Sequence, residues 1–344
     1  YYMASVKDFT AYGFDFSNCR KISEADYLKL KKQGCVPESG DILVGKDGAR
    51  YFEDVIIYRQ KEQPALLSSI AILRVDDTKV TSEFLYYTLK SPTVKKDVRD
   101  NYGSGSAIPR IVLKDFKRMP ISFPSLKEQK KITNICELLD EKIQLNNRIN
   151  NNLEQQAQAI YQQMFIENQN PNWKEGKLSD LVAVKYGKNH KKLDGGCYPV
   201  YGSGGIMRYV EKPLYTGESV LIPRKGTLNN VMYVNGAFWS VDTMFYTEML
   251  RPNIAKFVYH FVKGKDLASL NAGSAVPSMT TNILNAMPLY VPDDKTLSIF
   301  EETVTPMYSQ MQENEKQSAN LANIRDTLLP RLMSGELEVS DIDL

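Results

Sequence analysis

The two halves of this 344-residue chain carry the same succession of sequence features. The segment Gly105–Pro109 returns as Gly273–Pro277, and Met119–Ile121 returns as Met287–Leu289 at the same spacing. The correspondence continues without a gap to Phe165, whose counterpart is Met333. Spaced identities over so long a run argue against a chance similarity of turns. The repeat therefore predicts two equivalent half-molecules, each an irregular domain followed by a long helix.

Each half ends in a stretch with helical periodicity. In 125–165 glycine and proline are absent, and Ser125 with Glu128 forms a capping-box signature at the start. Apolar residues recur every three or four positions, which is typical of a helix that packs along a partner helix. In the second half Pro306 predicts a kink and Gly335 the end of the helix. The expected seam residues are Ile132, Ile135, Leu139, Ile143, Asn146, Ile149, Leu153, Ala157, Ile160 and Met164, then Phe300, Val304, Met307, Met311, Asn314, Leu321, Ile324, Leu328 and Leu332.

Because the two helices are equivalent in sequence, we expect them to pack against each other in antiparallel fashion. The fold class expected is α+β, with two pseudo-repeated mixed α/β domains separated by two long antiparallel coiled-coil-like helices. Asn146 and Asn314 fall at equivalent seam positions, and the sequence allows either a buried asparagine that fixes the register or a solvated one at the seam edge. The expected boundaries are 1–124 for the first domain, 125–166 for the first helix, 167–292 for the second domain, 293–335 for the second helix and 336–344 for an acidic tail.

Composition and motifs argue for a binding protein rather than an enzyme. The chain has 43 Lys and Arg against 41 Asp and Glu, which excludes a strongly basic, histone-like protein but permits local basic patches. Four dispersed cysteines and two histidines provide no zinc site, and they favour reduced thiols in a cytoplasmic protein. Each Gly-Lys pair lacks the Ser or Thr of a phosphate-binding loop, and no stretch is apolar enough to span a membrane.

Loop residues that follow predicted strands offer chemistry for DNA. Arginine can bond guanine, asparagine can bond adenine, and lysine, serine and backbone amides mostly hold phosphates. Each residue alone could simply be a solvated loop residue, but the set recurs in both halves. The candidates are Lys46, Arg50, Tyr51, Tyr102, Ser104 and Arg110 in the first half, and Lys188, Asn189, Lys191, Lys192, Tyr201, Ser203, Arg208, Arg224, Lys225, Asn229 and Ser274 in the second.

The ordered set of motifs resembles the specificity (S) subunit of type I restriction-modification systems along nearly the whole chain. Individually weak, the motifs come in the family's order. In the second half they are Tyr201–Ile206, Val220–Gly226, Phe238–Thr243 and Gly273–Pro277, with Asn172–Leu181 resembling the usual opening of a target recognition domain; in the first half they are Gly40–Leu43 and Pro124–Ile132.

The resemblance implies that each globular domain is a target recognition domain for one half of a bipartite double-stranded DNA site. It implies that the helices dock two modification (M) subunits, which carry S-adenosylmethionine, while restriction (R) subunits add ATP with Mg. This chain would then hold no cofactor and no catalytic residue. The first domain has no counterpart of the segment 172–190, so we expect it to be incomplete at its N-terminus.

Two other hypotheses stay open at this point. The chain could be a helical scaffold or adaptor protein without DNA specificity, since long helices and globular domains also suit protein assembly. A stand-alone nuclease or methyltransferase is disfavoured by the missing motifs.

Overall fold

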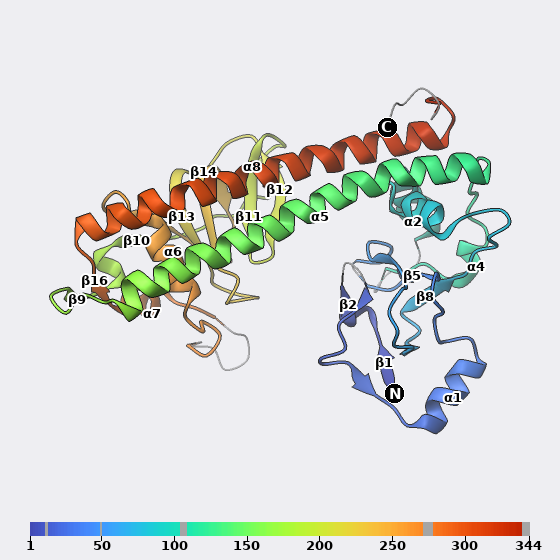
Figure 1. The fold of residues 1–344 in the computed structure, drawn as a ribbon, viewed down its shortest axis with the longest axis horizontal. Coiled ribbons are helices and arrows are strands. Elements are labelled where there is room, and N and C mark those ends of the chain that lie inside the picture. The colour runs from blue at the N-terminus through green and yellow to red at the C-terminus, as the bar shows by residue number, and fades with distance from the viewer. Residues whose placement is uncertain (11–12, 49, 104–108, 271–277, 339–344) are drawn as a thin grey trace. The chain divides into compact units, whose positions relative to one another are not determined.

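The computed structural model describes residues 1–10, 13–48, 50–103, 109–270 and 278–338, and it divides into two compact units (Figure 1). The first unit comprises Tyr1–Asn147 with Glu315–Leu344, and the second comprises Arg148–Asn314. Two long helices, α5 (Leu126–Gln162) and α8 (Asp294–Met333), contribute to both units. Ser125 caps α5 as expected, because its Oγ accepts from the Glu128 backbone N–H at 3.4 Å, and Oε2 of Glu128 accepts from the Ser125 backbone N–H at 3.0 Å.

Small sheets and short helices make up the rest of the first unit. Strand β5 is the centre of a three-stranded antiparallel sheet of order β6-β5-β8, and all four of its residues are buried. A second sheet has the order β4-β1-β7, and β2 pairs with β3. The elements are β1 (Tyr2–Ala4), β2 (Phe9–Thr10), β3 (Gly13–Phe14), β4 (Arg20–Lys21), β5 (Ile42–Gly45), β6 (Val55–Ile57), β7 (Ala65–Leu66), β8 (Ile70–Leu73), α1 (Glu24–Lys32), α2 (Ser82–Lys90), α3 (Pro92–Asp97), α4 (Leu113–Phe116), and the short turns η1 (Val6–Asp8) and η2 (Val98–Tyr102).

A six-stranded sheet of order β10-β15-β13-β14-β11-β12 dominates the second unit. Its neighbours are antiparallel except for β11 and β14, which run parallel. A separate antiparallel pair joins β9 to β16. The elements are η3 (Gln163–Glu167), β9 (Lys174–Lys177), η4 (Leu178–Asp180), β10 (Val182–Tyr186), β11 (Tyr198–Gly202), β12 (Gly205–Val210), β13 (Tyr215–Pro223), β14 (Met232–Ser240), β15 (Met244–Met249), α6 (Ala255–Lys263), α7 (Thr281–Asn285) and β16 (Pro288–Val291).

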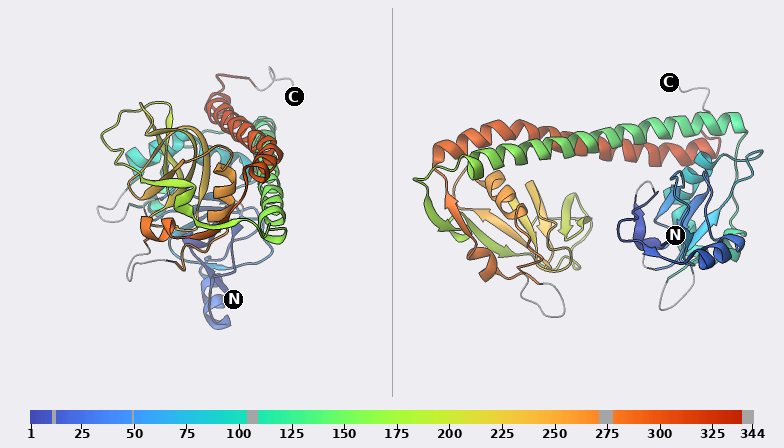
Figure 2. Two further views of the ribbon diagram at one scale, coloured as in Figure 1. Left: turned by 90° about the vertical axis from the view of Figure 1, so that its left-hand side faces the viewer. Right: turned by 60° about the horizontal axis from the view of Figure 1, so that its bottom comes forward.

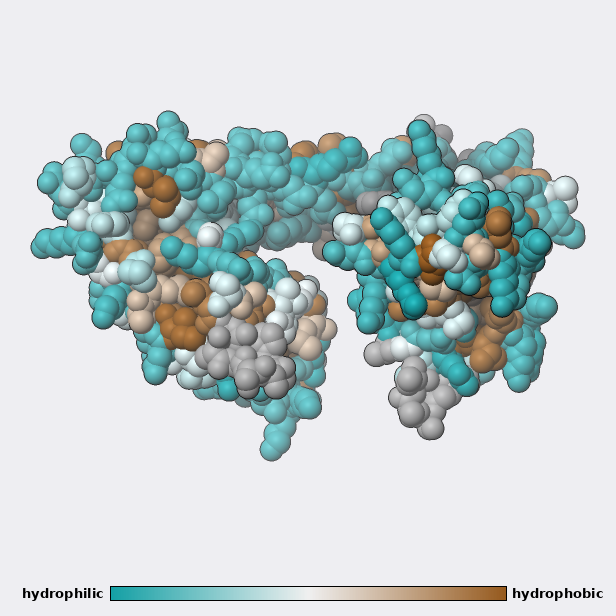
Figure 3. Space-filling view, turned by 90° about the horizontal axis from the view of Figure 1, so that it is seen from below, coloured by the Kyte–Doolittle hydropathy of each residue, from teal (hydrophilic) through white to brown (hydrophobic). Residues whose placement is uncertain are grey.

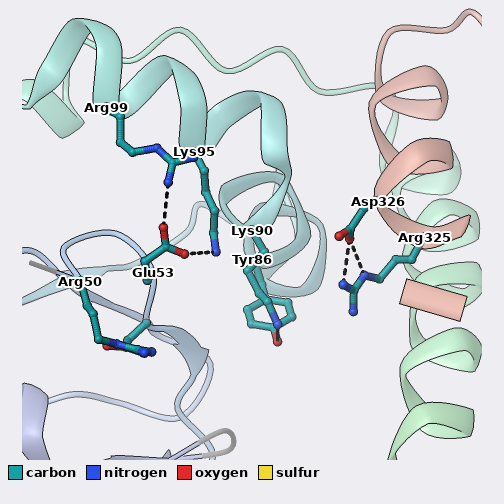
Figure 4. Close-up of polar contacts among 9 residues, drawn as sticks. Arg50, Glu53, Tyr86, Lys90, Lys95, Arg99, Arg325 and Asp326 are labelled. Carbon is teal, nitrogen blue, oxygen red and sulfur yellow. Dashed lines mark hydrogen bonds and ion pairs between the residues drawn. The ribbon is translucent and has the colours of Figure 1, made fainter. Parts of the chain in front are cut away.

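The repeat seen in the sequence is also a repeat of contacts. In α2 the Lys90 ammonium donates a hydrogen bond of 2.7 Å to the hydroxyl of Tyr86 (Figure 4). In α6 Lys263 donates to Tyr259 at the same 2.7 Å. Both helices pack through aromatic side chains against the long helices, with Phe84 in one unit and Phe257 in the other fully or nearly fully buried. The expected fold class, two mixed α/β repeats with long antiparallel helices, is confirmed.

Buried asparagines join α5 and α8, and this settles the alternative left open by the sequence. Asn146 is 1% exposed and donates to Oε1 of Gln317 at 2.8 Å and to Oγ of Ser318 at 3.2 Å. Asn314 is 6% exposed and donates to Oδ1 of Asn150 at 2.7 Å. The first contact lies in the first unit and the second in the second unit. In each, the two helices lie side by side and antiparallel (Figures 1 and 2).

Two expected seam residues lie off the seam. Ile149 is 37% exposed, because its neighbour Asn150 faces α8 and donates to the Met311 carbonyl at 3.1 Å. Ile324 is 36% exposed, because its neighbour Arg325 turns toward α5. Polar contacts take the place of apolar ones at both positions. The prediction from apolar periodicity that Ile149 and Ile324 lie in the seam is therefore wrong.

The contact made by Arg325 is an ion pair between the helices of the first unit. Its guanidinium donates to Oδ1 of Asp140, and it also bonds Asp326 in its own helix (Figure 4). Oδ2 of Asp140 accepts from the Tyr87 hydroxyl at 3.0 Å, which brings α2 into the same group. Burial, reinforced by the Asp140 charge, raises the pKa of Tyr87, so the hydroxyl remains a donor.

The equivalent place in the second unit holds a buried neutral histidine. His260 is fully buried in α6, where its Nδ1 lies 2.7 Å from Oε1 of Gln158 and its Nε2 lies 2.9 Å from the Tyr308 hydroxyl. An amide oxygen can only accept, so Nδ1 carries the proton and Nε2 accepts from Tyr308. Burial lowers the pKa of His260 from 6.5 to about 4.

All four cysteines, Cys19, Cys35, Cys136 and Cys197, are free thiols. Among the described residues, no helix combines the length and the apolar character of a membrane span.

Substituting Asp140 tests the interhelical ion pair. We expect Asp140→Ala to lower the free energy of unfolding by about 2 kcal/mol, because Arg325 and the Tyr87 hydroxyl lose a half-buried acceptor. Urea denaturation measures the change. The control is Glu141→Ala at an exposed neighbouring position, for which a change within about 0.5 kcal/mol is expected. Equal losses in the two variants would show that the pair adds no stability.

Acid should destabilise the second unit through His260. The unfolded chain takes up a proton near pH 6.5, whereas the folded chain does so only near pH 4. The contribution of the neutral His260 to the free energy of unfolding is therefore fully present above pH 6.5. It falls by up to about 3 kcal/mol as the pH drops toward 4. Thermal unfolding of the native chain and of His260→Gln between pH 7.5 and 4.5 measures this. The variant should show a shallower pH dependence, and an unchanged slope would contradict the assignment.

Candidate nucleic-acid interface

Within each unit, two loops that are distant in the sequence are joined by backbone contacts, and these contacts are equivalent in the two units. In the second unit the chain leaves β13 at Arg224, whose carbonyl accepts from the Met279 amide at 3.0 Å, and Lys225 pairs with Ser278 in an isolated bridge. In the first unit the chain leaves β5 at Lys46, whose carbonyl accepts from the Ile111 amide at 2.9 Å. Asp47 pairs there with Arg110 in an equivalent bridge. The sequence repeat thus places basic residues at one structural position in each unit.

A glycine turns the first loop of each pair. Gly48 has a φ of 95° and Gly226 a φ of 83°, which is the left-handed region that disfavours other residues. A Cβ atom at Gly226 would also lie 2.8 Å from Oγ of Ser203 in the turn between β11 and β12. Glycine therefore lets the loop after β13 approach the β11–β12 hairpin closely.

Two contacts hold the Arg224 side chain in place. Its guanidinium lies 5.5 Å from the ring centroid of Tyr186, at the end of β10. Its Nη1 donates to the Asp242 carbonyl at 3.2 Å. Stacking and a single hydrogen bond orient the guanidinium while leaving most of its five donors for another acceptor.

Asn229 holds its loop together. Its amide nitrogen donates to Oδ1 of Asp266 at 3.0 Å, and its amide oxygen accepts from the Ala268 backbone at 3.0 Å. The hydrogen bond from Asn229 lowers the pKa of the Asp266 carboxyl. The neighbouring Asn230 donates to the Ser203 carbonyl at 2.7 Å and joins this loop to the hairpin. Asn229 therefore positions the loop, and its amide is already bonded within the protein.

The basic run after β10 is fastened at both ends. The Lys188 carbonyl accepts from the indole nitrogen of Trp239 at 2.8 Å. The Leu193 carbonyl accepts from Arg208 of β12 at 2.6 Å. Before the run, a Cβ at Gly187 would overlap the Val241 carbonyl oxygen, so only glycine fits there. Between these anchors the residues Lys188, Asn189, Lys191 and Lys192 are exposed.

The basic residues of the first unit are more strongly paired. Arg50 donates to Oδ1 of Asp54 at 2.8 Å, and this hydrogen bond raises the pKa of its guanidinium. Glu53 in the same loop accepts from Lys95 at 2.8 Å and from Arg99 at 3.1 Å, which ties the loop to α3 and η2 (Figure 4). Acidic residues thus offset much of the positive charge here.

The structure brings together most of the sequence-predicted residues of the second unit. Arg224, Lys225 and Asn229 lie on the loop that approaches Ser203, and Arg208 joins the same hairpin to the basic run 188–192. In the first unit, Lys46, Arg50 and Arg110 lie along the paired loops, whereas Tyr51, Tyr102 and, in the second unit, Tyr201 pack against buried clusters. Ser104 and Ser274 lie outside the described residues.

Sequence reasoning missed several exposed side chains in the second unit. Tyr186 supports Arg224, and Ile206, Met207 and Tyr209 are exposed on β12. The consecutive apolar residues Ile206 and Met207, directly after a glycine-rich turn, could have drawn attention to them. Figure 3 shows hydrophobic side chains interspersed among hydrophilic ones on the surface of each unit. Within the described ranges, no group of three or more His, Cys, Asp or Glu side chains could hold a metal ion.

Comparison with known proteins agrees with this repeated architecture. The sequence profile of the family described as "Type I restriction modification DNA specificity domain" matches twice, at residues 5–155 and 170–318. The MjaIX specificity subunit of Methanocaldococcus jannaschii is 23% identical over 308 residues, covering 76% of this chain and 71% of the relative. A putative type I specificity subunit of Mycoplasma pneumoniae is 24% identical over 289 residues, covering 77% and 76%.

A similar fold has been solved. The type I restriction-modification S subunit from M. genitalium superposes with a TM-score of 0.51 at 20% identity, covering 97% of this chain and 88% of that one. The two profile matches together span most of the sequence. This chain therefore belongs to the family of type I restriction-modification specificity (S) subunits.

Proposed function

We propose that this chain reads a bipartite DNA site for a type I restriction-modification complex, with each globular domain acting as the target recognition domain of one half-site. The observation that carries the proposal is the duplicated pair of loops. In each unit the carbonyl of the basic residue that follows a strand, Lys46 or Arg224, accepts a hydrogen bond from a residue two positions after the repeated Gly–Pro segment. A target in two parts would call for such a repeated binding element.

In this proposal the α5–α8 pair sets the spacing of the half-sites and docks two M subunits. The buried asparagines support a fixed register, which a spacer of constant length requires. In the first unit Leu138 and Leu145, seven residues apart on α5, are exposed and offer apolar positions to a partner helix.

The chemistry would reside on the partners. M subunits would bring S-adenosylmethionine and transfer the methyl group, and R subunits would bring ATP with Mg. This chain's part would be recognition and assembly without a cofactor of its own.

Selection from random duplexes tests the proposal against the adaptor alternative. The chain, assembled with its M subunits, is incubated with duplexes of random sequence, and bound DNA is sequenced. Enrichment of one interrupted motif, matching the methylated motif found in the host genome, supports the proposal. Binding without sequence preference, or no binding, would favour an adaptor without DNA specificity.

Substitutions in the second unit should separate base reading from phosphate binding. We expect Arg224→Ala to weaken binding to the selected duplex by about 1–3 kcal/mol and to relax the choice at one base pair, because a fixed guanidinium can bond guanine in two places. Lys191→Ala should weaken all sequences about equally and lower the salt dependence, because an exposed ammonium neutralises a phosphate. Binding titrations with single-base variants of the duplex measure both effects.

A matched pair of conservative variants serves as the control. Lys191→Arg should restore the salt dependence, whereas Arg224→Lys should not restore the base choice. Uniform weakening by Arg224→Ala across all duplex variants would contradict its assignment to base reading.

A further inference from the structure

A β-bulge places two consecutive apolar side chains at the surface of the second unit. Along β11 and β12, Val200 pairs with Arg208 and Tyr201 pairs with Ile206, so Met207 has no partner across the hairpin. The extra residue breaks the alternation of the strand. Ile206 and Met207 are 51% and 61% exposed, where regular pairing would turn one of them inward. Bulges commonly redirect a side chain near a functional site.

The hairpin is held as a firm support for these side chains. Gly202 makes room for Met207, because a Cβ there would clash with its thioether sulfur. Arg208 bonds the Leu193 carbonyl on one side, and the Ser203 carbonyl accepts from Asn230 on the other. Strand β12 is the last strand of the six-stranded sheet, and β11 pairs with β14 on its other side, so the hairpin forms the edge of the sheet and β12 has one open edge.

The same contacts connect the hairpin to loops that carry positively charged residues. Arg208 connects it to the run that carries Lys191 and Lys192, and Asn230 connects it to the loop that carries Lys225. Ile206 and Met207 form an apolar tip between exposed lysines. This arrangement is complementary to a DNA groove, whose floor exposes bases and whose edges are phosphates. The major groove is about 12 Å wide, and β-strands can enter it. The apolar group displayed there is the C5 methyl of thymine.

We propose that Ile206 and Met207 enter the major groove and contact thymine methyl groups, so that the bulged hairpin reads part of the half-site. This inference rests on the proposed function and adds a base contact that is apolar. Arg224 and the lysines would bond guanine and phosphates beside it.

Replacing thymine by uracil tests the contact, because it removes only the methyl group and keeps base pairing. The full chain with its M subunits is titrated with the selected duplex and with the same duplex in which every thymine is replaced. The wild type should bind the uracil duplex about fourfold more weakly for each methyl contacted. Ile206→Ala/Met207→Ala should bind the thymine duplex more weakly and lose most of the difference between the two duplexes.

Two further variants keep the result interpretable. Leu250→Ala removes an equally exposed apolar side chain outside the hairpin and should behave as the wild type. Met207→Leu keeps an apolar tip and should retain the preference for thymine. Circular dichroism melting confirms that each variant is folded.

Other outcomes overturn the inference in distinguishable ways. Wild-type binding that ignores uracil, or a double variant that keeps the full thymine preference, would refute the methyl contact while leaving the proposed function intact. A wild-type dimer that the hairpin substitutions disperse would assign the apolar tip to a second copy of the chain. Absence of sequence-selective binding by the wild type would overturn the proposed function, and this inference with it.

Discussion

The buried asparagine contacts between α5 and α8 are the constraint on which each unit depends. An amide in a helix seam must find a partner, because an unpaired buried polar group costs about 1–3 kcal/mol. Asn146 finds Gln317 and Ser318 in one unit, and Asn314 finds Asn150 in the other. A shift of either helix by one turn would leave these amides unpaired, so the register is fixed by polar satisfaction as well as by apolar packing.

The two units solve one packing problem with different chemistry. Helix α2 or α6 packs on the helix pair through aromatic side chains, and each has a Lys-Tyr hydrogen bond within the helix itself. Beside them, the first unit has an ion pair, Asp140 with Arg325, whereas the second has the neutral His260 between Gln158 and Tyr308. At these equivalent positions the duplicated backbones thus carry different side chains, and each set is paired within its own unit.

The candidate interface likewise combines equivalent backbone contacts with different side chains in the two units. The backbone contacts that join the paired loops are identical in kind, but the charges around them differ. In the first unit Asp54 and Glu53 engage Arg50, Lys95 and Arg99, whereas in the second unit Lys191 and Lys192 are exposed. A shared frame with separately variable loops fits the proposal that the two domains read different half-sites.

Periodicity and repetition in the sequence determined the two mixed α/β repeats and the long antiparallel helices, and the ordered set of motifs indicated the family. Those features depend on local patterns, which one linear chain displays directly. The tertiary structure alone decided that Asn146 and Asn314 are buried, and that Asn150 and Arg325 displace Ile149 and Ile324 from the seam. It also decided that Asn229 is bonded to Asp266 and that a bulge exposes Met207. Each depends on a partner distant in the sequence or on strand pairing, which apolar spacing does not encode.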